Sequence, residues 1–268
     1  MLYFVATPIG NLADITFRAI EILNSVDLIA CEDTRHSLSL LNHYNIKKPL
    51  LSCHKFNERE SAEKICAQLS QGKNVAVISD AGTPVISDPG NILSQILIEK
   101  GFEFTVIPGA CAFVPALILS GFNCSSFTFI GFLPEKKAEA EKLLQNYLPL
   151  TTPLIFYVAP HDIEKTTQVL YEILGDRRAV AVREITKIYE ERIEFSLKEG
   201  YKGERRGEFV LIVEGNLLKQ DEAVNPLEMV DNLIKLGVSK MDAIKQTAKE
   251  LGIKKNELYK MVVESEEN

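Results

Sequence analysis

Three short loops in the N-terminal half of the chain are built almost entirely from proline, glycine and other small residues. They read TPIGN (7–11), SDAGTP (79–84) and PGACA (108–112). Small side chains let a ligand approach the backbone closely, so that main-chain N–H and C=O groups can recognise it. The alternative is that all three are tight turns with no ligand, but turns do not usually demand so many small residues. We therefore expect a binding site that these loops share.

The composition of the loops limits the ligand. The chain contains neither G-x-G-x-x-G nor G-x-x-x-x-G-K-[ST], so a dinucleotide or triphosphate cradle is unsupported. None of the three loops contains lysine or arginine, which disfavours an anionic phosphate group. Asp80 and Asp88, in and after the second loop, favour a ligand with positive charge.

The most polar stretch of the N-terminal half is CEDTRH (31–36). Its charged residues Asp33 and Arg35 either cap a helix or position a substrate, with the arginine contacting a phosphate or carboxylate. His54 has the same two possible roles, structural or in the site. No spacing of His, Cys or Glu indicates a metal site, so we expect the protein to bind no metal. No serine or cysteine lies in a nucleophile elbow.

Apolar periodicity places the loops at the ends of strands. Strands are expected at 2–6, 28–31, 75–78 and 104–107, with helices between them, the first from Asp14 and another capped by Asn57 and Glu60. Strands that alternate with helices predict a mostly parallel sheet. In such sheets ligands bind beyond the carboxyl ends of the strands, where the three loops lie.

The second half changes pattern. The segments 191–197 and 209–213 read as neighbouring strands with little between them, which predicts antiparallel pairs in a mixed sheet. Three short helices follow, and residues 235–260 contain seven lysines against three acidic residues. Such helical faces either contact nucleic-acid phosphates or are simply solvated. The predicted division is an α/β domain at 1–113, a second α/β domain at 114–217 and a helical, lysine-rich extension at 218–268.

Composition sets broad limits. The 268 residues carry a net charge of −7, so any contact with nucleic acid must come from local basic patches. The five cysteines have no paired spacing, which argues against a disulfide framework and fits a reduced, cytoplasmic compartment. No apolar run approaches the roughly 18 residues that a membrane span needs. The N-terminal stretch reads as a strand and not as a signal peptide.

A set of motifs in fixed order resembles a known family. They are TPIGNLADIT, DLIACEDTRH, VISDAGTPVISDPG, PGACA, FIGFLP, LIFYVAPH, REITKIYEE and GEFVLIVEG, which together span residues 7–215. This set closely resembles the ribosomal RNA small subunit methyltransferase I family, the ribose 2′-O-methyltransferase branch of the tetrapyrrole methylase superfamily. TPIGNL-DIT and EDTR distinguish the branch from the corrin and uroporphyrin methylases.

The resemblance implies a two-domain fold, a homodimer and S-adenosylmethionine as cofactor, held between the domains. The cofactor-binding residues that it implies are Pro8, Ala81, Gly82, Thr83, Ile86, Cys111, Ala112, Val158, Ala159 and Thr186. The sequence departs from the family after LIFY, where relatives have E-S-x-H-R and this chain has Val158 to Asp162, and at Ala110, where relatives often have proline.

The resemblance also implies the reaction. We expect 2′-O-methylation of a cytidine in 16S ribosomal RNA near the decoding centre, acting on the RNA or on the assembled small subunit. A 2′-hydroxyl is weakly acidic, so a base or a nearby cation would help. The candidate catalytic residues are Asp33, Arg35, Glu184, Lys187 and His54. Two alternatives remain: methylation of a tetrapyrrole, corrin or diphthamide precursor, and an inactive RNA-binding module.

Overall fold

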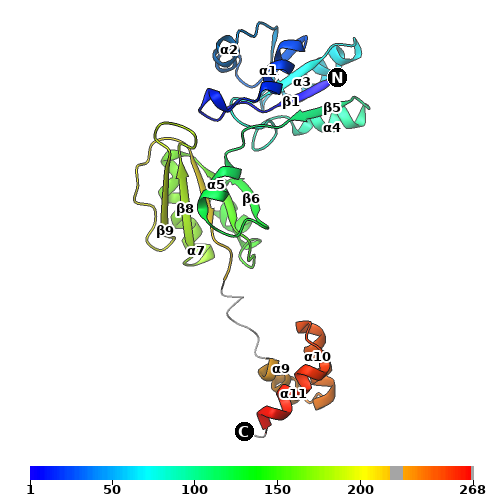
Figure 1. Cartoon of the computed structure of the whole chain (residues 1–268), viewed down its shortest axis with the longest axis vertical. Helices are drawn as coiled ribbons and strands as arrows, with labels where there is room; N and C mark the ends of the chain where they lie inside the picture. The colour runs from blue at the N-terminus through cyan, green and yellow to red at the C-terminus, as the bar shows by residue number, and fades with distance from the viewer. Residues whose placement is uncertain (218–225, 267–268) are drawn as a thin grey trace. The chain divides into compact units, whose positions relative to one another are not determined.

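The computed structural model describes residues 1–217 and 226–266 and divides the chain into two compact units, residues 1–215 and 216–268. The first unit contains two sheets, and the described part of the second contains three helices and no strand (Figure 1). The predicted start of the C-terminal extension at residue 218 lies outside the described residues, and the boundary between 113 and 114 stays a prediction.

The first sheet is parallel, as predicted from the alternation of strands and helices. Its strand order is β3-β2-β4-β1-β5, and all four pairings are parallel. The strands are β1 (Leu2–Val5), β2 (Leu28–Cys31), β3 (Leu50–Ser52), β4 (Val75–Ile78) and β5 (Phe104–Ile107). Strand β3 was missed because its three residues lie at the edge of the sheet and are too few to show a period.

Helices cover both faces of this sheet. One core contains Leu2 and Leu93 and lies on the side of α3 (Glu58–Ser70) and α4 (Asn91–Glu99). The other core contains Val5 and Leu23 and lies on the side of α1 (Phe17–Ser25) and α2 (Thr34–His43). Burial on both faces explains why β4 is apolar at all four positions.

One predicted helix start was wrong, and another helix begins where predicted but without the predicted side-chain cap. The first helix begins at Phe17 and not at Asp14, because Thr16 accepts a hydrogen bond from the Ala19 N–H and so caps it, while Leu12–Asp14 forms a separate 3₁₀ turn. Helix α3 begins directly after Asn57, as predicted, but the Asn57 side chain does not cap it, because its oxygen accepts from the His54 N–H at 2.8 Å instead.

The second sheet is mixed, as predicted. Its order is β6-β7-β10-β8-β9, in which only the β6–β7 pair is parallel. The strands are β6 (Thr128–Phe132), β7 (Leu154–Val158), β8 (Arg178–Arg183), β9 (Glu191–Ser196) and β10 (Phe209–Val213). We call residues 1–107 the first lobe and residues 113–215 the second lobe.

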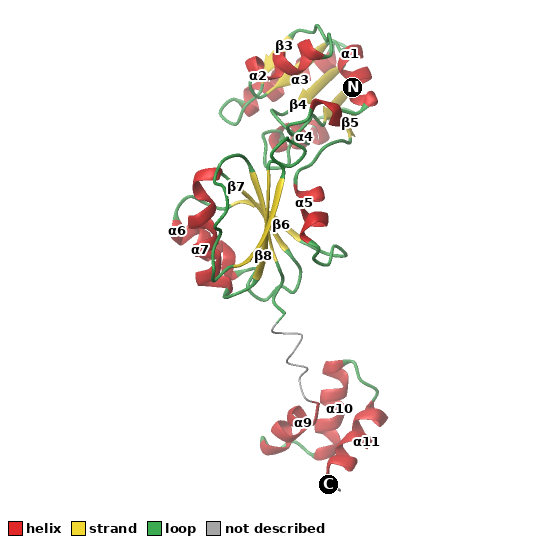
Figure 2. Cartoon of the chain, turned by 60° about the vertical axis from the view of Figure 1, so that its left-hand side comes forward, coloured by secondary structure: helices red, strands yellow, loops and turns green. Residues whose placement is uncertain are grey.

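Helices also cover both faces of the second sheet (Figure 2). Helices α6 (Lys137–Gln145) and α7 (Ile163–Leu174) lie on one face, and α5 (Phe113–Ser120) packs on the other. A 3₁₀ turn, η2 (Pro160–Asp162), leads into α7. Helix α5 was not predicted, because its uniformly apolar residues show no helical period.

The C-terminal unit has its own core. Helices α9 (Pro226–Lys235), α10 (Lys240–Leu251) and α11 (Lys255–Glu266) bury Val230, Ile244 and Leu258 between them. Ser239 caps α10 by accepting from the Asp242 N–H at 3.3 Å, as its S-x-x-D pattern predicted. No helix among the described residues is long and apolar enough to span a membrane.

Candidate functional site

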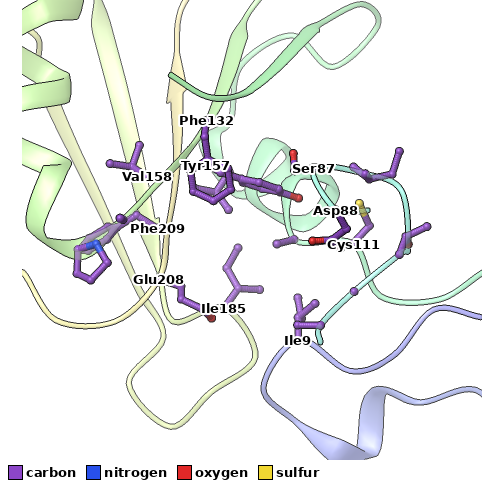
Figure 3. A pocket seen from close by; sticks show the side chains of 18 of the residues that line it. Ile9, Ser87, Asp88, Cys111, Phe132, Tyr157, Val158, Ile185, Glu208 and Phe209 are labelled. Atoms are coloured by element: carbon purple, nitrogen blue, oxygen red, sulfur yellow. The ribbon is translucent and has the colours of Figure 1, made fainter. Parts of the chain in front are cut away.

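A cavity of about 340 Å³ opens at the carboxyl ends of the first-lobe strands, against the edge of the second lobe (Figure 3). It has the volume of a small-molecule site. Its wall combines the small-residue loops with side chains of β7, β10 and the segment after β8. The lining residues are Ile9, Ala81, Gly82, Thr83, Ile86, Ser87, Asp88, Cys111, Ala112, Phe132, Tyr157, Val158, Ala159, Pro160, Ile185, Lys187, Glu208, Phe209 and Val210.

The three loops are joined by hydrogen bonds. Thr7 and Gly82 exchange two backbone hydrogen bonds, of 2.8 and 3.1 Å, which tie the first loop to the second. The Thr83 hydroxyl donates to the Ala110 carbonyl at 3.0 Å and ties the second loop to the third. The loops therefore form one wall, as expected for loops that follow neighbouring parallel strands.

Strained backbone is concentrated around this cavity. Of the five non-glycine residues with positive φ in the described ranges, four belong to two loops at its edge: Val85 (77°), Ser87 (65°), Glu184 (53°) and Thr186 (66°). Left-handed backbone is unfavourable for such residues, most of all for β-branched valine and threonine. Strain of this kind recurs at functional sites, where the surrounding structure imposes it.

Lys187 joins the lobes at the cavity wall. Its ammonium group lies 2.8 Å from both Glu184 and Glu208, and its aliphatic stem crosses Gly10, where a Cβ would come within 2.4 Å of the stem. Thr186 beside it donates a short hydrogen bond to Asp14. The two carboxylates compensate the lysine charge, so the cavity offers no uncompensated cation from this residue.

Most of the predicted cofactor-binding residues lie together. Eight of the ten line the cavity: Ala81, Gly82, Thr83, Ile86, Cys111, Ala112, Val158 and Ala159. The other two, Pro8 and Thr186, are not in its wall, although their neighbours Ile9 and Ile185 are. All five cysteines are free, as the sequence predicted, and Cys111 is the one in this wall.

The predicted catalytic residues do not lie together. Lys187 lines the cavity, and Glu184 forms an ion pair with Lys187. Asp33, Arg35 and His54 do not line the cavity. Hydrogen bonds from Arg35 hold the pKa of Asp33 at about 2, so this carboxylate is a poor proton acceptor. The Arg35 side chain is 90% exposed and is free to contact a large substrate.

His54 lies near a group of carboxylates instead. Its Nδ1 is buried and has no hydrogen-bond partner among the described residues. Burial, together with the charges of Asp80 and Asp88, raises the pKa of Glu32, and the nearby His54 lowers it. No group of three or more His, Cys, Asp or Glu side chains with metal-binding geometry occurs in the described residues.

The sequence-based list of site residues omitted Asp88 and Tyr157. Burial is the largest influence on the Asp88 carboxyl and raises its pKa. A hydrogen bond with the Ser79 hydroxyl lowers this pKa, and the charge of Asp80 raises it. Burial also raises the pKa of the Tyr157 hydroxyl. Asp88 is the second residue of the SDPG motif (87–90) and directly follows the strained Ser87; this motif was the available signal. Tyr157 belongs to an apolar strand, and no local pattern distinguishes it from a core residue.

Comparison with known proteins decides the family. Residues 1–200 match the family described as Tetrapyrrole (Corrin/Porphyrin) Methylases. A protein of Halalkalibacterium halodurans named ribosomal RNA small subunit methyltransferase I is 43% identical, over 96% of this chain and 93% of that protein. The chain belongs to the ribosomal RNA small subunit methyltransferase I family. The tetrapyrrole methylase fold and S-adenosylmethionine as the family's cofactor follow from this membership.

Solved structures agree on the fold. The methyltransferase CobJ superposes with a TM-score of 0.62 at 18% identity, over 80% of this chain and 93% of that one. Uroporphyrin-III C-methyl transferase of Thermus thermophilus, complexed with S-adenyl homocysteine, gives 0.56 at 16% identity, over 82% and 99%. The family match covers the whole first lobe and the second lobe as far as residue 200, so that β10 and the helices α9–α11 lie beyond it.

Two glycines allow a matched test of the cavity wall. Gly82 (φ +79°) lines the cavity, and Gly72 (φ +78°) has nothing within 4 Å of an added Cβ. Alanine at either position costs about 1 kcal/mol of folding stability, because both need left-handed backbone. We expect Gly82→Ala, and not Gly72→Ala, to weaken S-adenosylmethionine binding at least tenfold by calorimetry. Equal affinities in the two variants would remove Gly82 from the binding wall.

Proposed function

We propose that this chain methylates the ribose 2′-hydroxyl of a cytidine in 16S ribosomal RNA near the decoding centre of the small subunit. The observation that carries this proposal is similarity over nearly the whole chain to proteins named ribosomal RNA small subunit methyltransferase I. The substrate is RNA, either naked or in the assembled subunit.

The cavity suits a cationic methyl donor. Its loops present backbone and small side chains, its carboxylates are Asp88 and Glu208, and its one lysine is compensated by Glu184 and Glu208. Residues 81–83 with Ile86, residues 111–112 and residues 158–159 would hold S-adenosylmethionine, with Pro8 and Thr186 supporting the wall. When bound, this cofactor supplies a methyl group that moves from its positively charged sulfur to the ribose oxygen, leaving S-adenosylhomocysteine.

Asp88 is the residue that we assign as proton acceptor. Glu208 is engaged by Lys187, whereas Asp88 forms no ion pair with the described residues and lies in a largely apolar wall. Burial raises the pKa of Asp88, which makes it a stronger proton acceptor than an exposed aspartate. Asp88 accepts the proton that the 2′-hydroxyl releases. The cavity wall would also align the 2′-hydroxyl with the methyl group and exclude water.

The other candidates take supporting roles. Lys187 and Glu184 fix the loop after β8 against the first lobe. Arg35, held by Asp33 at the start of α2, is placed to contact an RNA phosphate. His54 lies near Glu32, which follows strand β2.

The proposal includes a homodimer that acts in the cytoplasm, where small subunits are modified. Helix α5 exposes Val114, Ile118 and Leu119, with exposed Phe127 packed against Phe113 of the same helix. Such a row of apolar side chains fits the surface of a second copy. Sedimentation velocity at micromolar concentration is expected to show a dimer, and Ile118→Glu a monomer. A wild-type monomer would contradict this part of the proposal.

The reaction itself is tested with labelled cofactor. Purified protein, methyl-labelled S-adenosylmethionine and small subunits that lack the modification should yield one methylated cytidine. Nuclease digestion followed by mass spectrometry should place the methyl group on its ribose. Label on a base carbon or nitrogen would refute 2′-O transfer. Label on a corrin or a diphthamide precursor, but not on RNA, would favour the alternative substrates, and cofactor binding without transfer to any of them would favour an inactive RNA-binding module.

The assignment of Asp88 predicts a pH dependence. Activity should require the ionised carboxylate, so it falls as the pH drops through the raised pKa of Asp88. Asp88→Asn should lower kcat by about 10²- to 10⁴-fold and change cofactor affinity little.

Asp80→Asn is the matched control in the same loop. The asparagine oxygen can still accept from the Asp33 N–H, as Asp80 does at 3.2 Å. Loss of the Asp80 charge lowers the pKa of Asp88, so the acid limb of the profile should shift to lower pH with kcat retained at its plateau. Full activity in Asp88→Asn would overturn the assignment.

The C-terminal unit supplies a test of RNA contact. Lys254 lies just before α11, Lys255 begins it and Lys260 lies near its middle; all three are exposed. We expect glutamine at all three to weaken RNA binding and to reduce the slope of log affinity against log salt by up to about 3. Glutamine at Lys235, Lys245 and Lys249, exposed on α9 and α10, removes the same charge. Equal losses in both triple variants would show that net charge matters and the α11 surface does not.

A further inference from the structure

A second cavity, of about 450 Å³, shares a wall with the first. The residues common to both are Phe132, Tyr157, Val158 and Ala159. Its far side is formed by the segment after β6 and by α6, η2 and α7. The remaining lining residues are Leu133, Pro134, Glu135, Lys137, Ala140, His161, Asp162, Lys165, Thr166 and Val169.

Phe132 is the most unusual residue of the shared wall. It ends β6, and although it is a large apolar side chain it is 58% exposed. Tyr157 meets its ring edge-on at 5.6 Å between centroids, and Phe129 supports Tyr157 in turn at 5.1 Å. Phe132 thus has aromatic support on one side and an accessible ring at the junction of the two cavities (Figure 3).

The polar groups of the second cavity differ from those of the first. Lys165 donates from Nζ to the Glu135 carbonyl at 3.3 Å, a bond that leaves its charge without a carboxylate partner in the described residues. Lys137 is paired with Glu172 at 2.7 Å, and His161 lies 3.3 Å from Asp162. An aromatic surface with a nearby uncompensated lysine and hydrogen-bonding side chains suits a nucleotide whose base is splayed out of its strand.

The shared wall also lies next to the proposed proton acceptor. Ser87 precedes Asp88 and packs against Gly131, which precedes Phe132; a Cβ on Gly131 would lie 3.0 Å from the Ser87 hydroxyl. Asp88 and Phe132 line the same cavity. A ribose placed at this wall therefore has the cavity of the methyl donor on one side and the carboxylate of Asp88 nearby.

We infer that the second cavity receives the acceptor nucleotide, with its base stacked on Phe132 and an adjacent phosphate contacting Lys165. The ribose then lies at the shared wall and presents its 2′-hydroxyl to the first cavity. This inference rests on the proposed function, since it names where the RNA acceptor of that reaction binds.

Substitutions at Phe132 test the stacking. Base–aromatic stacking is worth about 1–3 kcal/mol per base, which corresponds to roughly 5- to 150-fold in affinity. Phe132→Leu keeps the apolar contact with the first cavity but removes the ring. We expect it to lower kcat/KM for RNA within that range, at saturating S-adenosylmethionine, with the cofactor dissociation constant changed less than threefold. Phe132→Tyr, which retains a ring, should recover most of the loss.

Two further variants complete the test. Lys165→Gln should raise KM for RNA, reduce its salt dependence and leave cofactor binding unchanged. Phe17→Leu is the control: this phenylalanine is 88% exposed on α1 and lines neither cavity, so no parameter should change.

The outcomes separate this inference from the proposed function. If the wild-type protein transfers no methyl group to RNA, the proposed function fails. If the wild type is active and Phe132→Leu matches it, the function stands and the stacking inference is overturned. Loss of cofactor binding in Phe132→Leu would also overturn it, because Phe132 would then serve the first cavity.

Discussion

The contact of Lys187 with Glu184, Glu208 and Gly10 is the interaction on which the site depends. Lys187 is the one lysine in the wall of the first cavity, and the carboxylates of Glu184 and Glu208 balance its charge before any ligand binds. Its stem crosses Gly10 of the first lobe, so the same side chain links the second lobe to the first. A cationic ligand can therefore occupy a cavity whose construction requires a lysine.

Three parts of the chain differ in chemistry. Backbone turns at the carboxyl ends of parallel strands form a cavity wall with little charge, the second lobe adds aromatic side chains, and residues 235–260 contain seven lysines against three acidic residues. Under the proposed function, this local excess of positive charge is where a protein with a net charge of −7 would contact a polyanionic substrate.

Much of the fold was predictable from the sequence, because alternating strands and helices have few possible arrangements. The meeting of the loops at 79–84 and 108–112 was predictable in the same way, since loops after parallel strands lie at one edge of the sheet. Val158 and Ala159 were implied only by the family resemblance, because they lie at or directly after the end of β7, in the other sheet. Asp88 could have been proposed as a site residue from its place in SDPG (87–90). Tyr157 and Phe132 could not, because only the packing of β6, β7 and residues 85–88 brings them to the cavity. The sequence placed Asp33 among several candidate bases beside Arg35, but only the geometry shows that hydrogen bonds from Arg35 hold the pKa of Asp33 at about 2.

The left-handed conformations of Val85, Ser87, Glu184 and Thr186 limit how this protein can be engineered for heat tolerance. Glycine at these positions would release strain, and a search for stabilising changes by folding free energy alone would choose it first. The loops, however, would then sample additional conformations on both sides of the donor cavity. Ordering them would cost conformational entropy each time a ligand binds. Stabilising substitutions are better sought in the helices away from the first cavity, where a more rigid backbone does not slow turnover.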